Sequence, residues 1–223
     1  MKRQMKYRQI LRYFLDIFYP KRCPSCEKVI KHDQIFCEEC MDKYNGININ
    51  QYAKGGFRCV SPVPYDGVFE DAVKNFKFRN KRQYYFQLAE MMADSVNKEY
   101  FYDFDLVTYV PLHPKKLKFR GFNQSELLAK GVSENLEIPL VTTLRKTRNN
   151  LPQHKLKAPK REENVKGAYK IINKKLVEGK NILLVDDVVT TTNTLGECAK
   201  ILDYNLAANV CCVTFAATVA KTT

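Results

Sequence analysis

Four cysteines near the start of the chain have the types and spacing of a metal site. Cys23 and Cys26 form one C-x-x-C pair, and Cys37 and Cys40 form a second pair after ten intervening residues. Each pair can place two thiolates on one side of a tight turn, and two pairs can enclose one Zn²⁺ ion in a tetrahedron. Because this segment is too short to form a hydrophobic core of its own, bound zinc is expected to supply its folding energy. Because all four ligands come from the protein, this zinc is predicted to be structural rather than catalytic.

A second group of residues combines carboxylates with hydroxyls. The apolar run that starts at Asn181 is typical of a buried strand, which is expected to stop at Asp186 and Asp187. The carboxylates can accept two ribose hydroxyls or hold a divalent cation such as Mg²⁺. A polar turn follows, and its backbone N–H groups at the start of the next helix favour a phosphate. The order of these features predicts a site for a phosphorylated sugar. The turn of this site consists of Thr190, Thr191, Thr192, Asn193 and Thr194.

A third segment follows the apolar run Leu106–Val110, which is predicted to be another buried strand. Its basic side chains can neutralise phosphate oxygens in a loop, and Arg120 can donate two hydrogen bonds to one phosphate. Asn123 followed by Glu126 is typical of a capping box at a helix start. Asn123 and Gln124 can therefore be either helix caps or ligand contacts. The predicted ligand contacts of this segment are Leu112, His113, Lys115 and Arg120.

The segment from Asn181 to Thr194 resembles the phosphoribosyl-pyrophosphate (PRPP) motif of type I phosphoribosyltransferases. The resemblance implies that the acidic pair contacts the ribose hydroxyls, that the turn wraps the 5′-phosphate, and that Leu112–Arg120 binds pyrophosphate. The family usually has Gly where this chain has Thr192. Since Gly reaches positive φ without strain, a β-branched Thr is expected to be costly there or to require a different turn.

The positive charge is concentrated in two segments. The net charge is +13, and residues 1–31 and 145–170 each carry nine Lys or Arg against two acids. Such segments suit a polyanion, that is, nucleic acid, PRPP or an anionic membrane surface. The second segment is predicted to be either a lid over the sugar-phosphate site or a track for single-stranded DNA. The predicted DNA contacts are Arg145, Lys146, Arg148, Lys155, Lys157, Lys160 and Arg161.

No apolar run is long enough for a transmembrane helix, and eight cysteines without a signal peptide predict a reducing cytoplasm. In residues 1–19, apolar side chains recur at near-helical spacing with basic side chains between them. This lead can bind the inner face of the membrane, meet a partner or pack on the rest of the chain. The chain is thus divided into a basic amphipathic lead (1–19), a zinc module (20–55) and an α/β domain with a mainly parallel sheet (56–223). Helices are expected at Phe69–Phe78, Tyr84–Asn97 and residues 194–204, with further strands at Val60–Tyr65 and Val210–Ala216.

Several motifs narrow the resemblance to the ComF family, which joins an N-terminal cysteine module to a phosphoribosyltransferase-like domain. They are Pro111-Leu112-His113-Pro114, Arg120-Gly121-Phe122-Asn123-Gln124, Pro152-Gln153 and the Asp186-Asp187 segment. The resemblance implies DNA uptake during natural transformation beside a helicase-like partner. We therefore expect a competence protein that binds PRPP and single-stranded DNA. The alternatives are a phosphoribosyltransferase that acts on a base, and a non-catalytic, PRPP-sensing regulator that binds DNA.

Overall fold

The computed structural model describes residues 20–79, 81–101, 103–148, 167–190 and 192–219. Its centre is a six-stranded sheet in the order β1-β2-β8-β7-β4, with β3 beside β8. The pairs β2–β8, β8–β7 and β7–β4 are parallel, and β1–β2 is an antiparallel hairpin. The strands are β1 (Ile49–Ala53), β2 (Phe57–Ser61), β3 (Val63–Pro64), β4 (Leu106–Tyr109), β7 (Asn181–Val189) and β8 (Asn209–Ala217).

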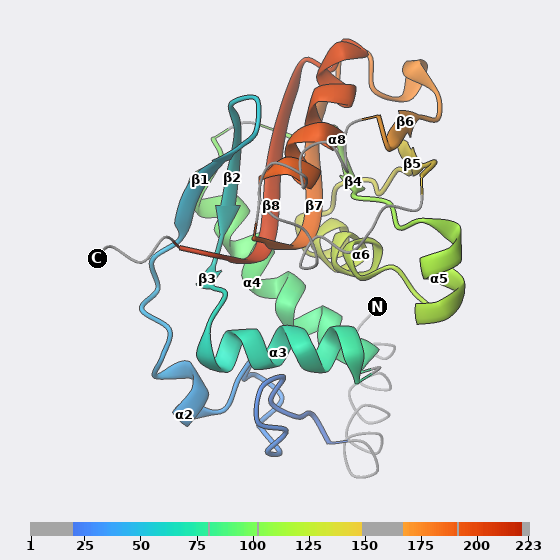
Figure 1. Cartoon of the computed structure of the whole chain (residues 1–223). Coiled ribbons are helices and arrows are strands. Elements are labelled where there is room, and N and C mark those ends of the chain that lie inside the picture. Colours follow the sequence, from blue (N-terminus) through green and yellow to red (C-terminus); the bar gives the residue numbers. More distant parts are fainter. Residues whose placement is uncertain (1–19, 80, 102, 149–166, 191, 220–223) are drawn as a thin grey trace, which may run out of the picture.

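Helices cover both faces of this sheet (Figure 1). The faces differ because successive residues of β7 point in opposite directions. Leu183 and Val185 join one core with α4 and α6, and Ile182 and Leu184 join a second core with α8. The helical elements are α2 (Glu38–Met41), α3 (Gly67–Phe78), η1 (Arg82–Tyr84), α4 (Tyr85–Glu99), α5 (Pro114–Arg120), α6 (Gln124–Leu136), η3 (Lys174–Leu176) and α8 (Asn193–Tyr204).

A small antiparallel hairpin lies apart from the main sheet, on the side of α8 (Figure 1). It consists of β5 (Leu144–Lys146) and β6 (Tyr169–Ile171), the two strands that flank the basic segment. The predicted mainly parallel α/β fold is confirmed. Within the described residues, no helix is long and apolar enough to cross a membrane.

The cysteine segment packs directly on the main domain. Asn75 of α3 donates to the carbonyls of Pro24 and Ser25, both at 2.8 Å, and Gln87 of α4 donates to the Ile35 carbonyl at 2.6 Å. Phe36 packs edge-on against a phenylalanine of α3 in the same core. Strand β1, which lies in the range assigned to the zinc module from the sequence, is the edge of the main sheet. The cysteine segment and the sheet therefore share one core.

Candidate sugar-phosphate site and zinc centre

The acidic pair lies within strand β7 rather than after it. Asp186 is paired with Thr214 of β8, and the strand continues to Val189. The expectation that the strand stops at the carboxylates was therefore wrong. The pairing with β8 persists because the residues after the carboxylates are apolar and β8 is long enough to accompany them. Both carboxylates are thus fixed by a hydrogen-bonded strand at its carboxyl end, where ligands of parallel α/β sheets bind.

Ser125 at the start of α6 orients the first carboxylate. Its hydroxyl donates to Asp186 Oδ1 at 2.6 Å, and the Asp187 N–H donates to the same oxygen at 2.9 Å. Ser125 is not among the site residues predicted from the sequence, because 61 positions separate it from Asp186. The available signal was a hydroxyl two residues after the predicted helix start at Asn123.

Lys77 neutralises the second carboxylate. Its Nζ lies 2.9 Å from Asp187 Oδ2, and the two side chains are only 18% and 13% exposed. Lys77 lies in the last turn of α3, far from Asp187 in the sequence, and is not among the site residues predicted from the sequence. A ligand hydroxyl that approaches Asp187 therefore meets a carboxylate that already has a cation beside it.

The pKa of Asp186 is raised to about 7, chiefly by burial and then by the neighbouring Asp187 carboxylate. The hydrogen bonds from Ser125 and the Asp187 N–H, and the charge of Lys77, act against this rise. Asp186 thus changes charge near neutral pH, a property that is common among carboxylates of functional sites.

The polar turn adopts a conformation that Thr tolerates. Thr192 has φ −71° and ψ 0°, and α8 begins directly after it. Thr192 does not need a positive φ, so this turn differs from the turn that a Gly at this position would form. The backbone strain predicted for Thr192 is therefore absent. Thr190 is exposed, and Thr191 lies outside the described residues. The Lys54 N–H donates to the Thr192 carbonyl at 3.3 Å, which holds the turn against the β1–β2 hairpin.

The segment predicted as a pyrophosphate loop is largely helix α5. His113 caps this helix, because its Nδ1 accepts from the Lys115 N–H at 3.2 Å. Pro114 at the first position and Gly121 with φ +79° after the last residue are the signals that predict such a helix. The loop prediction was therefore wrong; Lys115 and Lys118 are exposed, and Lys116 is half-buried.

Residues at the end of α5 contact the start of α6. Arg120 donates to Gln124 Oε1 at 2.8 Å. Asn123 precedes α6 but makes no side-chain cap, because its amide donates to the Val110 carbonyl at 3.2 Å. Glu126 instead accepts from the Tyr109 hydroxyl at 3.2 Å, so the capping box does not form.

The hairpin β5–β6 places the basic residues differently from the predicted DNA track. Lys146 is half-buried, and its Nζ donates to the Tyr169 hydroxyl at 2.8 Å. Burial lowers the pKa of Lys146, and Lys116 lowers it further. Lys146 is therefore less accessible to a DNA strand than Arg145 and Arg148, which are exposed. Lys155, Lys157, Lys160 and Arg161 lie outside the described residues.

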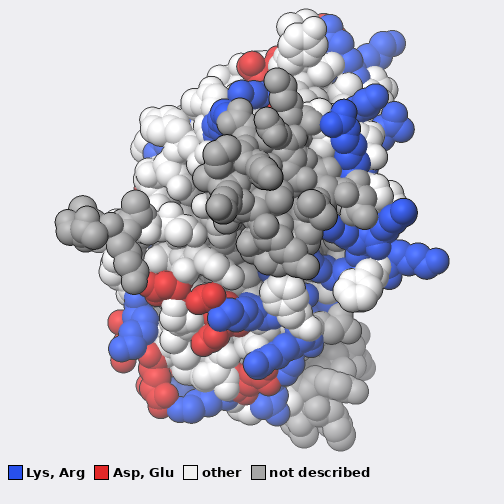
Figure 2. Space-filling view, viewed as in Figure 1, with Lys and Arg blue, Asp and Glu red and all other residues white. Residues whose placement is uncertain are grey.

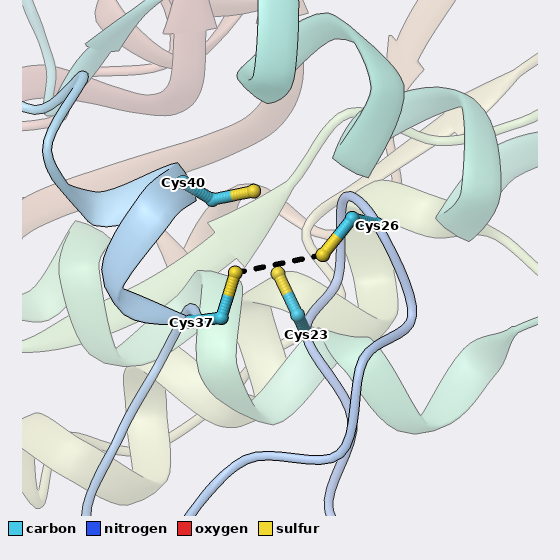
Figure 3. Close-up of side chains that lie close together, drawn as sticks. All are labelled: Cys23, Cys26, Cys37 and Cys40. Carbon is cyan, nitrogen blue, oxygen red and sulfur yellow. Dashed lines mark hydrogen bonds between the residues drawn. The ribbon is translucent and has the colours of Figure 1, made fainter.

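The four cysteines of the N-terminal module meet as predicted (Figure 3). Their sulfur atoms all lie within 4.8 Å of one another, and Cys26 Sγ is 3.5 Å from Cys37 Sγ. A tetrahedron of Zn–S bonds of about 2.3 Å requires sulfur separations of about 3.8 Å. The geometry and the donor type therefore fit a structural zinc. Cys23 and Cys40 are buried, so the metal would face the core of the domain on one side.

The fold and these two sites define a class of protein: a mainly parallel phosphoribosyltransferase-type domain joined to a four-cysteine zinc module. Comparison with known families agrees for both parts. The phosphoribosyl transferase domain matches residues 123–223, and the double zinc ribbon domain matches residues 14–52. The chain is also similar to the APRTase of Giardia lamblia, at 13% identity over 78% of this chain and 83% of that chain, with a TM-score of 0.43.

The chain belongs to the ComF/YhgH family. It is 30% identical to the DNA utilization protein YhgH of Salmonella typhimurium over 193 residues, which cover 84% of this chain and 80% of the relative. It is 28% identical to competence protein F of Haemophilus influenzae, over 81% of this chain and 83% of the relative. Competence protein ComFC of Bacillus subtilis is 28% identical over 67% of this chain and 60% of the relative.

Proposed function

We propose that this protein binds PRPP or a related sugar phosphate and single-stranded DNA, and that it assists DNA uptake in natural transformation. Its relatives carry the names of competence and DNA utilization proteins. In this proposal it acts in the cytoplasm beside the DNA uptake machinery, including a helicase-like partner, and the basic lead can hold it at the inner membrane face.

The observation that supports the sugar-phosphate site most strongly is the placement of Asp186 and Asp187. They lie near the carboxyl end of a central parallel strand, and the polar turn after it opens a 12-residue helix. The carboxylates would accept the two ribose hydroxyls, and the turn from Thr190 to Thr194 would hold the 5′-phosphate by its N–H groups. Mg²⁺ would arrive with the pyrophosphate and balance its charge.

The basic groups near this site would serve the pyrophosphate. Lys116 is half-buried, and burial lowers its pKa, with Arg120 nearby lowering it further. Among the described residues neither cation forms an ion pair, and a bound polyanion would relieve their mutual repulsion. The exposed Arg145 and Arg148 would contact the phosphates of a DNA strand.

The decisive experiment is calorimetric titration of the zinc-loaded full chain with PRPP and Mg²⁺. Wild type is expected to bind, and Asp187→Asn is expected to bind at least about 10-fold more weakly, because a carboxylate partner of ribose is lost. Asp203→Asn is the matched control, since Asp203 is an exposed acid of α8 away from the turn. Equal affinity of wild type and Asp187→Asn would refute the assignment.

A second titration tests DNA. Fluorescence anisotropy with a labelled oligonucleotide is expected to show binding that weakens steeply with salt, because phosphate contacts release counterions. Addition of candidate bases to the PRPP-bound protein, with release of pyrophosphate as the readout, distinguishes a phosphoribosyltransferase from a binding protein.

A further inference from the structure

Two phenylalanine rings are exposed on the basic side of the molecule. Phe119 of α5 is 95% exposed, and Phe78 at the end of α3 is 69% exposed. Single exposed apolar side chains are common in proteins and need no explanation by themselves. These two rings differ from other exposed apolar side chains because basic residues surround them. We name this region the phenyl surface, which consists of Phe78, Arg79, Lys115, Lys118, Phe119 and Arg120.

Positive charge dominates the phenyl surface. Helix α5 contains four basic residues and no acid, and α3 ends next to Arg79. Within the described part of the chain, neither Lys115 nor Lys118 forms an ion pair, and the acid nearest to Arg79, Glu27, is already paired with Lys81. Figure 2 shows Lys and Arg side chains gathered along the side of the molecule where α5 and the β5–β6 hairpin lie. The charge is therefore available to an anionic partner.

The structure brings the two rings into one region although 41 positions separate them in the sequence. The Arg120 guanidinium lies over the Phe78 ring, 5.4 Å from its centroid. The next residue, Gly121, packs against Arg82, because a Cβ at Gly121 would lie 2.8 Å from Arg82 Nη2. Arg82 in turn lies 4.7 Å from the centroid of the buried Phe122 ring. These stacked contacts fix the end of α5 to the end of α3.

We propose that the phenyl surface binds single-stranded nucleic acid, with bases stacked on Phe119 and Phe78 and phosphates held by Lys118 and Arg79. Exposed aromatic faces among cations are the recurring means of binding single strands, because every base has a face that can stack. A duplex offers no such faces, since its bases stack on one another. A bilayer would favour a continuous apolar face, whereas here the rings stand singly among charges.

This inference rests on the proposed DNA-binding function, but it assigns the contact to residues outside the basic segment 145–170. It also places the strand close to the sugar-phosphate site. Lys77, the immediate neighbour of Phe78, forms the ion pair with Asp187. A DNA strand on the phenyl surface would therefore pass beside the cation that neutralises the acidic pair.

The absence of tryptophan from the chain permits a direct test. Phe119→Trp introduces a single indole, whose fluorescence is expected to be quenched when a dT oligonucleotide stacks on it. The matched control is Phe101→Trp, because Phe101 is equally exposed, at 89%, and lies near Asp103 rather than among cations. Quenching at position 119 and not at position 101 supports the proposal. Equal quenching at both positions, or none at position 119, overturns it.

Affinities measured by anisotropy provide the second readout. Phe119→Ala and Phe78→Ala are each expected to weaken oligo(dT) binding about 5-fold or more, as loss of one stacking platform does. Phe119→Tyr should retain wild-type affinity, because an aromatic face remains. Since Phe119 is almost fully exposed, its replacement leaves the core intact. Unchanged affinity of Phe119→Ala would contradict the proposal.

The outcomes separate this inference from the proposed function. If wild type binds DNA and both alanine variants bind equally well, the phenyl surface is wrong and the DNA function stands. If wild type does not bind DNA, both are wrong. If the Phe119→Trp emission shifts to the blue on vesicles of phosphatidylglycerol but is not quenched by oligo(dT), the surface binds membranes, and the proposal is overturned.

Discussion

Replacing Asp186 with Asn should make the protein more stable at alkaline pH. In the folded protein the pKa of Asp186 is raised to about 7 from its usual 3.8, chiefly by burial and then by Asp187. The folded state therefore binds a proton more tightly than the unfolded chain does. The contribution of Asp186 to the free energy of unfolding is fully present below about pH 4 and is lost as the pH rises to about 7. Asn does not ionise, so the variant avoids this loss.

The size of the effect follows from the shift. Three pKa units at about 1.4 kcal/mol each set an upper limit of about 4 kcal/mol above pH 7. The Asn side chain keeps the oxygen that accepts from Ser125 and from the Asp187 N–H. Relaxation around the ionised carboxylate reduces the effect, so we expect Asp186→Asn to be about 2–4 kcal/mol more stable at pH 8.

The assay is urea denaturation of the zinc-loaded protein at several pH values between 5 and 8. The difference in unfolding free energy between Asp186→Asn and wild type should already be present at pH 5, grow up to about pH 7 and level off towards pH 8. Titration of groups that do not interact with Asp186 cancels in this difference. Asp203→Asn, an exposed change on α8, should show no such trend. A difference that does not vary with pH, or a variant less stable at pH 8, would refute the reasoning.

Three further predictions concern packing and the metal. Lys77→Met should lower stability at pH 8 by about 1–3 kcal/mol, because it leaves the mostly buried Asp187 without its cation; urea unfolding of Lys77→Met in the Asp187→Asn background should show a much smaller loss. Chelation of zinc, or Cys23→Ser, should lower the thermal midpoint in calorimetry by about 10 °C or more, since Cys23 and Cys40 belong to the main core; an unchanged midpoint after verified metal loss would contradict a structural role. Gly131→Ala should cost about 1–2 kcal/mol in urea unfolding, because its Cβ would lie 2.5 Å from the Ala89 Cβ where α6 crosses α4; Ala89→Gly in the same chain should recover part of that loss.

Features that depend on local pattern were predictable from the sequence. The cysteine spacing, the apolar run of β7 and the helix after the polar turn each report on neighbours within a few residues. The structure confirms the meeting of the four sulfurs and the parallel sheet. Their prediction required no knowledge of long-range contacts, because a metal knuckle and a strand–turn–helix unit are local structures.

Features that depend on contacts distant in the sequence were not predictable in this way. Ser125 and Lys77 reach the acidic pair from two different helices, and only the packing of those helices on the sheet brings them there. Lys146 looked like any other lysine of a basic segment, but the hairpin turns its side chain onto Tyr169. Helix α5 was predictable from local signals, because Pro114 and Gly121 mark its two ends in the sequence.

Three consecutive residues of α3 face three different parts of the molecule. Asn75 holds the backbone of the first cysteine knuckle, Phe76 packs on Phe122 in the core, and Lys77 reaches Asp187. Metal loss that loosens the knuckle would free the Asn75 amide and the turn of helix that carries Lys77. A single turn of α3 thus links the zinc module mechanically to the acidic pair, so that disorder in the one would be transmitted to the other.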